Sequence, residues 1–150
     1  MPGKGHFLMG IRQHVDEWLA AHGETVIGWR RHFHTHPELS HQERHTTEFI
    51  TTVLREHGMT PTLFPTTGLM VDIGPGVGPR IAFRADLDAL PIEETAPVAF
   101  RSASPGVMHA CGHDVHTAIV LALACALNTY PLTVLFSNRR RKSWRVARQM

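Results

Sequence analysis

The segment from His109 to His116 gathers the side chains that bind transition metals. Its sequence, His-Ala-Cys-Gly-His-Asp-Val-His, holds three imidazoles, one thiol and one carboxylate. Thiolate and imidazole are ligands that borderline-soft ions such as zinc prefer. Cys111 and His113 can reach one ion only if the backbone bends sharply between them, and Gly112 permits such a bend. The segment therefore predicts a divalent metal site.

Two carboxylates, Asp86 and Asp88, directly follow a predicted strand over residues 80–85. In open α/β sheets, the residues beyond the strand ends form the usual site crevice. Carboxylates there could bind a metal, orient a histidine ligand or act in acid–base chemistry. The alternative is that Asp88 caps the loop and that Asp86 pairs with Arg84 or another base.

Apolar residues at helical spacing predict two helical stretches near the N-terminus, over residues 11–21 and 25–33. We expect Gly23 to interrupt them, because glycine weakens a helix interior. Pro37 should end the second stretch, because proline blocks helical continuation. His34 lies in a His-x-x-Pro-Glu motif, which we interpret as structural.

A further helix is expected after Ser40, because Ser40 and Glu43 have the spacing of a capping box. Gly58 occupies a plausible position just beyond the end of this helix. A buried, largely apolar helix is predicted over about 114–127, with Cys125 as a small buried residue. The predicted metal site therefore lies where a loop enters a buried helix.

The remaining regular segments read as short strands over residues 60–65, 69–73, 80–85 and 132–136. Strands that alternate with helices indicate an α/β fold with helices on the faces of a sheet. We expect a three-layer sandwich, with a central mixed and mostly parallel sheet flanked by helices.

Composition narrows the class of protein. The 150 residues are 43% hydrophobic and 19% charged, as in a soluble globular domain. No apolar run approaches the roughly 20 residues that span a bilayer, and the N-terminus does not read as a secretory signal. The two cysteines give no disulfide framework. These features predict a cytoplasmic protein without a membrane segment.

Charge is distributed unevenly along the chain. Six of the 15 lysines and arginines lie between Arg139 and Met150, a stretch without an acidic residue. The rest of the chain then holds nine basic and 13 acidic residues, a net charge of −4. A basic end on an acidic body could be an arm for nucleic acid or a membrane surface, or a segment that was not selected with this fold.

Three motifs occur in a recognisable order: Trp-Arg-Arg-x-x-His-x-x-Pro-Glu-Leu-Ser from Trp29, Arg-Ala-Asp-Leu-Asp-Ala-Leu-Pro-Ile from Arg84, and Met-His-Ala-Cys-Gly-His-Asp-x-His-x-Ala from Met108. Together they resemble the dinuclear-metal amidohydrolases, which include hippurate hydrolase, N-acyl-amino-acid amidohydrolases and indoleacetyl-amino-acid hydrolases. These belong to the wider zinc aminoacylase and carboxypeptidase group. The likeness covers roughly residues 11–136.

The resemblance implies a metal-dependent hydrolase that cleaves the amide bond of N-acyl amino acids or related small molecules. Two divalent metals (zinc, manganese, cobalt or nickel) would hold a bridging water and lower its pKa, and a glutamate would take its proton. The resemblance also implies homodimers, paired through an inserted small domain. It implies neither a nucleic-acid partner nor a membrane.

The same resemblance assigns roles to individual residues. Cys111 and His113 would be metal ligands, with Cys111 plausibly bridging both ions. Asp88 would be a supporting residue near the site, and Asp86 more weakly so. Three more residues would lie beside the site without being assigned as ligands, namely His109, Asp114 and His116. For His116, packing and direct coordination remain equal alternatives.

The sequence departs from this pattern after Phe136. Where the family continues with Gln-Pro-Ala-Glu-Glu, which supplies the general base and a metal ligand, this chain reads Ser-Asn-Arg-Arg-Arg-Lys-Ser-Trp. We therefore expect residues 1–136 to be the N-terminal part of a catalytic domain and 137–150 to be a disordered tail outside the family pattern, the product of a frameshifted or prematurely ended reading frame. The chain alone is then expected to have little or no activity.

Two other classes of function remain open. One is a metal-binding or interaction fragment without catalysis. The other is a cysteine nucleophile enzyme that pairs Cys111 with His113 or His116. The surrounding motif favours the metal site, because no orienting triad accompanies the cysteine.

Overall fold

The computed structural model describes residues 4–74 and 80–130. Within these residues the chain forms three helices and one small sheet, in the order α1 (Lys4–Thr35), α2 (Arg44–Glu56), β1 (Thr62–Leu63), β2 (Leu69–Met70) and α3 (His113–Asn128). The predicted strand over residues 132–136 and the tail over 137–150 lie outside the described residues.

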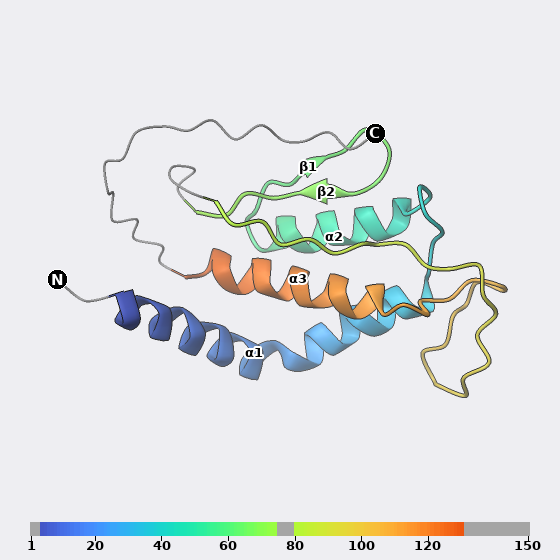
Figure 1. Ribbon diagram of the computed structural model, residues 1–150, viewed down its shortest axis with the longest axis horizontal. Coiled ribbons are helices and arrows are strands. Elements are labelled where there is room, and N and C mark those ends of the chain that lie inside the picture. The colour runs from blue at the N-terminus through green and yellow to red at the C-terminus, as the bar shows by residue number, and fades with distance from the viewer. Residues whose placement is uncertain (1–3, 75–79, 131–150) are drawn as a thin grey trace.

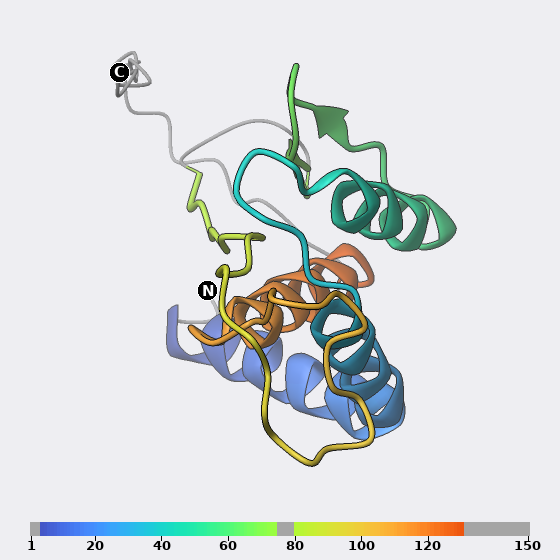
Figure 2. The same cartoon turned by 90° about the vertical axis from the view of Figure 1, so that its right-hand side faces the viewer.

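Helix α3 lies between the other two helices, with α1 along one side and α2 on the other (Figures 1 and 2). Its buried face is built mainly from small side chains, which let neighbouring helices approach closely, namely Thr117, Ala118, Ala122, Cys125 and Ala126. Cys125 on this face is fully buried, as predicted. The core side chains are Trp18, Trp29, Phe33, Ile50, Val53, Leu54, Met59, Ala118, Leu121, Ala122, Cys125 and Ala126.

Helix α1 runs without interruption from Lys4 to Thr35, so the expected break at Gly23 is wrong. A glycine in a helix interior costs about 1 kcal/mol relative to alanine. Trp18 and Trp29, on either side of Gly23, are both buried, and burial of such side chains stabilises the helix by more than that cost. Figure 1 shows α1 changing direction near its middle while remaining helical. The helix ends before Pro37, as expected.

The start of α2 differs from the predicted capping box. The helix begins at Arg44, and no side-chain cap hydrogen bond is made by its N-cap residue, Glu43. The backbone N–H groups of His45 and Thr46 instead donate to the carboxylate of Glu38, at 3.1 and 2.8 Å. Glu38 thus satisfies two of the free donors of the first turn from outside the helix. Ser40 lies in a turn that precedes it.

The end of α2 agrees with the sequence. Gly58 has a left-handed φ of 75°, and its N–H donates to the carbonyl of Arg55 at 2.9 Å. The N–H of Met59 donates to the carbonyl of Leu54 at 3.0 Å. This pair of hydrogen bonds is a Schellman motif, which requires the left-handed residue at Gly58.

The sheet is smaller than predicted. Strands β1 and β2 form an antiparallel pair with Thr62 opposite Met70 and Leu63 opposite Leu69, within the expected segments 60–65 and 69–73. The predicted strand over 80–85 has no strand neighbour among the described residues. The described part is therefore a helical layer with a small sheet, and the three-layer sandwich stays a prediction.

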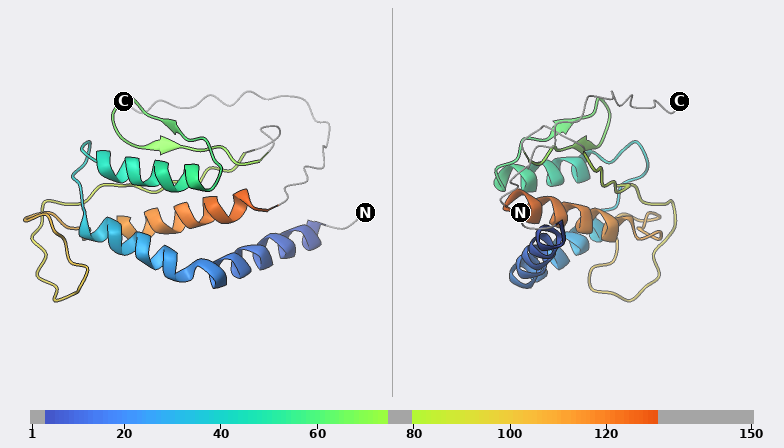
Figure 3. Two further views of the ribbon diagram at one scale, coloured as in Figure 1. Left: turned by 180° about the vertical axis from the view of Figure 1, so that it is seen from behind. Right: turned by 60° about the vertical axis from the view of Figure 1, so that its left-hand side comes forward.

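From residue 80 to the start of α3 the chain first crosses the helices as extended chain and then forms a long projecting loop at one end of the molecule (Figures 1 and 3). Isolated bridges join Leu39 to Ala89 and Leu90 to Met108. They fix both ends of this loop near the start of α3. Over residues 4–74 and 80–130, none of the helices has the length and apolar character needed to traverse a bilayer.

Candidate metal centre

His113 is the first residue of α3, and its ring is oriented by Asp88. The Nδ1 atom of His113 lies 2.9 Å from the backbone oxygen of Asp88 and 3.0 Å from its carboxylate oxygen Oδ1. Both side chains are about one quarter exposed. A ring that donates from Nδ1 presents the lone pair of Nε2, which is the arrangement of histidine ligands oriented by a carboxylate. Several roles were considered for Asp88, and this geometry fits the role in which Asp88 orients a histidine.

Gly112 makes the predicted bend between Cys111 and His113. Its φ of 78° and ψ of 20° are left-handed, and a Cβ at this position would meet no heavy atom within 4 Å. The glycine is therefore required by backbone conformation rather than by lack of space. It directs the chain into α3 and leaves Cys111 exposed, with a free thiol.

The second cysteine is in a different environment. Cys125 is fully buried in α3, and burial raises the pKa of its thiol to about 11. A fully buried thiol with a raised pKa is accessible neither to substrate nor to a metal ion. The described structure thus leaves Cys111 as the cysteine available for chemistry.

Asp86 pairs with Arg84, which is the alternative that the sequence left open for this carboxylate. Its carboxylate pairs with Arg84, and both side chains are largely exposed. Its backbone oxygen accepts a hydrogen bond from Oγ1 of Thr117 at 3.2 Å, which ties the extended segment to α3. The arrangement gives Asp86 a role in holding the chain beside the helix.

Two more histidines flank the pair. His116 is exposed, and its ring centroid is 6.1 Å from that of His113. His109 is buried, and both of its ring nitrogens lack a hydrogen-bond partner within the described ranges. Burial is the main cause that lowers the pKa of His109, so its ring is neutral at neutral pH.

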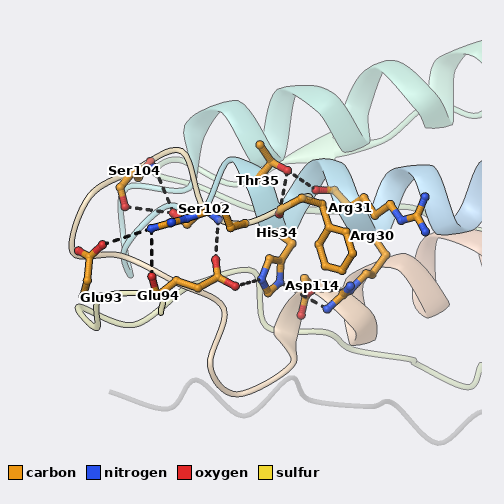
Figure 4. A network of polar contacts seen from close by, with 11 residues as sticks. Arg30, Arg31, His34, Thr35, Glu93, Glu94, Ser102, Ser104 and Asp114 are labelled. Carbon is orange, nitrogen blue, oxygen red and sulfur yellow. Dashed lines mark hydrogen bonds and ion pairs between the residues drawn. The ribbon is translucent and has the colours of Figure 1, made fainter. Parts of the chain in front are cut away.

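Asp114, the second residue of α3, belongs to a buried polar network that reaches α1 (Figure 4). Its Oδ2 atom lies 2.8 Å from Nε of Arg30 and 2.8 Å from Nδ1 of His34. The other ring nitrogen of His34, Nε2, lies 3.0 Å from the carboxylate of Glu94. His34 therefore has two specific partners, Asp114 and Glu94, in keeping with the structural role expected of it.

Sequence reasoning did not single out Glu94. It is 4% exposed, and its pKa is lowered first by the hydrogen bond from the backbone N–H of Ser102 and then by the one from His34. Glu94 lies 60 residues from His34 in a loop with no recognisable motif, so no local signal pointed to the pair.

The described residues do not by themselves form a complete metal site. Over residues 4–74 and 80–130, no group of three or more His, Cys, Asp or Glu side chains is arranged to hold an ion. Cys111 and His113 offer one thiolate and one imidazole, which together suit zinc, cobalt and similar ions. Such a pair fits a metal but does not complete its coordination.

Comparison with known proteins places these residues in a family. Residues 82–134 match the description "Peptidase family M20/M25/M40". The chain is 52% identical over 116 residues to an N-acyl-L-amino acid amidohydrolase of Geobacillus stearothermophilus, a match that covers 76% of this chain and 30% of that protein. It is also 50% identical over 109 residues to a protein of Rhodococcus jostii named putative glutamate–cysteine ligase 2-3, covering 72% of this chain and 14% of that protein.

A solved structure agrees in fold. A protein of Bacillus subtilis, described as a dinuclear metal-binding peptidase of the M20 family, superimposes with a TM-score of 0.69 at 45% identity. The match covers 73% of this chain and 32% of that one. The chain therefore spans about a third of the length of the amidohydrolase and of the solved peptidase.

Proposed function

Because the chain belongs to peptidase family M20/M25/M40, we propose that it forms part of a metal-dependent hydrolase that cleaves the amide bond of N-acyl amino acids. The observation that carries the proposal is the His113–Asp88 contact beside Cys111. Asp88 fixes the imidazole of His113 through Nδ1, which leaves Nε2 for a metal. The exposed thiol of Cys111 lies two residues away in the sequence.

Each of these residues has a separate task in the proposed site. Cys111 binds as a thiolate and His113 through Nε2, while Asp88 holds the ring of His113 in one tautomer. Two bound divalent ions would lower the pKa of a water and stabilise negative charge on the amide oxygen. Zinc, cobalt and nickel are proposed because a thiolate and an imidazole suit such metals, and manganese is proposed on the family resemblance alone.

The remaining ligands and the general base are proposed to come from outside the described residues. A catalytic zinc site uses three protein ligands, and no group of three such side chains is arranged to hold an ion among residues 4–74 and 80–130. The sequence contains no Gln-Pro-Ala-Glu-Glu segment. Without a positioned base the rate falls by typically 10²–10⁴-fold, so we expect the 150-residue chain to show little or no turnover.

The test is the release of amino acid from N-acetyl- and N-benzoyl-amino acids with zinc, manganese or cobalt added. A full-length family member provides the reference rate. Turnover that approaches this rate would contradict the expected inactivity, whereas no turnover together with binding of metal by Cys111 is the expected result. Failure to bind metal through Cys111 would contradict the proposed site itself.

A non-catalytic metal-binding or interaction fragment is the second candidate. The incomplete ligand set among the described residues favours it. The two candidates are distinguished by mixing the chain with a partner fragment that carries the glutamate motif. Restored hydrolysis supports the enzyme, and metal binding without restored hydrolysis supports the fragment.

Further properties of the whole protein are proposed on the family resemblance. They are the three-layer α/β sandwich, with residues 80–85 as one strand of its sheet, and pairing into homodimers through a domain other than the described helices. A cytoplasmic location is proposed because the two cysteines give no disulfide framework, as in proteins of a reducing compartment. No nucleic-acid or membrane partner is proposed.

A further inference from the structure

The last turns of α1 contact both segments that flank the candidate metal ligands (Figure 4). We propose that Arg30 and His34 are positioning residues, which hold the start of α3 and thereby set the metal affinity of Cys111 and His113. This inference rests on the proposed function, because it needs those two residues to bind metal.

The first contact is with the start of α3. Gly112, the N-cap residue, makes no side-chain cap hydrogen bond, so the first turn depends on other contacts for its orientation. Asp114 lies one residue after His113, and its side chain is 1% exposed. Its Oδ2 atom is hydrogen-bonded to Nδ1 of His34 at 2.8 Å and forms an ion pair with Nε of Arg30 at 2.8 Å. Helix α1 therefore fixes the turn that carries His113.

The second contact is with the loop that leads into Cys111. His34 reaches Glu94 at 3.0 Å, and the same carboxylate accepts the backbone N–H of Ser102 at 2.5 Å. The loop is further joined to α1, because Ala103 N–H donates to the carbonyl of Thr35 at 2.8 Å. The ring of His34 thus connects the chain before Cys111 to the helix after it.

The chemistry of the ring makes this connection specific. Both nitrogens of His34 face carboxylates that are almost completely buried. An imidazole can donate to both only when each nitrogen carries a hydrogen, and a glutamine side chain offers donors at one end alone. Replacement of His34 by glutamine therefore preserves approximate size but leaves one carboxylate without its donor.

The loop also packs against the cations of α1. The guanidinium of Arg30 lies 4.7 Å from the centroid of the Phe100 ring, and that of Arg31 lies 5.4 Å from it. Arg30 therefore contacts the loop through Phe100 and α3 through Asp114. Arg30 and His34 lie one turn apart on the same face of α1. Each of them joins the loop before Cys111 to the start of α3, by different contacts.

The test is a cobalt(II) titration of the full 150-residue chain, followed by the thiolate-to-cobalt absorption band. Outer partners of metal ligands typically change affinity by about 10–100-fold, so His34→Gln is expected to weaken binding about tenfold with the band retained at saturation. The matched control is His36→Gln, an exposed histidine two residues along the chain, which should leave affinity unchanged. A folded His34→Gln protein with wild-type affinity would overturn the inference, even if its melting temperature fell.

Two measurements separate this inference from the proposed function. If the wild type gives no band, or if Cys111→Ser keeps it, the proposed metal site has failed. Hydrogen exchange of the N–H groups of Val115 and His116, which donate to the carbonyl of Gly112, then tests the positioning alone. The inference requires faster exchange in His34→Gln than in His36→Gln. If His34→Gln does not fold, Glu94→Gln is measured instead and is held to the same two criteria.

Discussion

The Nδ1 atom of His113 lies 2.9 Å from the carbonyl oxygen of Asp88 and 3.0 Å from its carboxylate, across 25 residues of sequence. This contact gives the predicted site its orientation, because a donor at Nδ1 leaves the lone pair of Nε2 available to a metal. It also joins two of the three motifs found in the sequence.

Asp88→Ala is expected to weaken zinc binding by about tenfold, the lower end of the range for such partners. The backbone carbonyl of Asp88 remains as an acceptor for Nδ1, which limits the loss. Competition with a chromophoric chelator measures the affinity. Asp86→Ala is the control, because Asp86 pairs with the exposed Arg84, and equal losses in the two variants would contradict the assigned orientation.

Glu38→Ala should lower the free energy of unfolding by about 1–3 kcal/mol, because it leaves donors at the start of α2 without their acceptor. Urea denaturation followed by circular dichroism measures the change. Ser40→Ala tests the rival capping-box account and should have little effect. A larger loss in Ser40→Ala than in Glu38→Ala would mean that the helix is capped as the sequence first indicated.

Two glycine-to-alanine changes should have opposite effects on stability. Gly58 has a φ of 75°, and alanine there is expected to cost about 1 kcal/mol. Gly23 lies inside α1 with nothing within 4 Å of an added Cβ, so alanine should stabilise by about 1 kcal/mol. Thermal denaturation of both variants checks the prediction. Destabilisation by Gly23→Ala would indicate that α1 is broken there.

The lowered pKa of Glu94 makes the stability of the folded protein depend on pH. Its pKa is lowered from 4.5 in the folded protein, so the folded state binds its proton less readily than the unfolded chain does. The stability contributed by Glu94 is therefore present above pH 4.5 and is lost as the pH falls through the folded value. Melting temperatures of wild type and Glu94→Gln should differ at pH 7 and converge on acidification. A difference that stays constant over this range would contradict the predicted linkage.

Local patterns predicted the elements that short-range contacts decide. The left-handed residue at Gly58 ends α2, and the bend at Gly112 precedes α3, because glycine alone adopts such φ values at little cost. The helix around Cys125 was readable from its apolar run. Gly23 was misread because local propensity is weaker than the burial of neighbouring tryptophans.

Contacts between segments that are distant in the sequence could not be predicted from local patterns. Glu38 replaces the expected cap of α2 by folding back from the preceding turn, and Glu94 meets His34 from a loop without periodicity. Sequence spacing carries no information on such pairs, because only the packed structure brings them together. The candidate ligand pair, Cys111 and His113, could be predicted because both residues lie within one bend, whereas the polar network that surrounds them could not.

Zinc X-ray absorption on the metal-loaded chain reports the atoms bound to the ion, so it shows whether Cys111 and His113 are metal ligands. We expect a sulfur scatterer at about 2.3 Å together with imidazole nitrogen, and loss of the sulfur in Cys111→Ser. The imidazole contribution should fall in His113→Ala. A shell of oxygen and nitrogen alone in the wild type, unchanged by either substitution, would contradict the assignment of Cys111 and His113 as metal ligands.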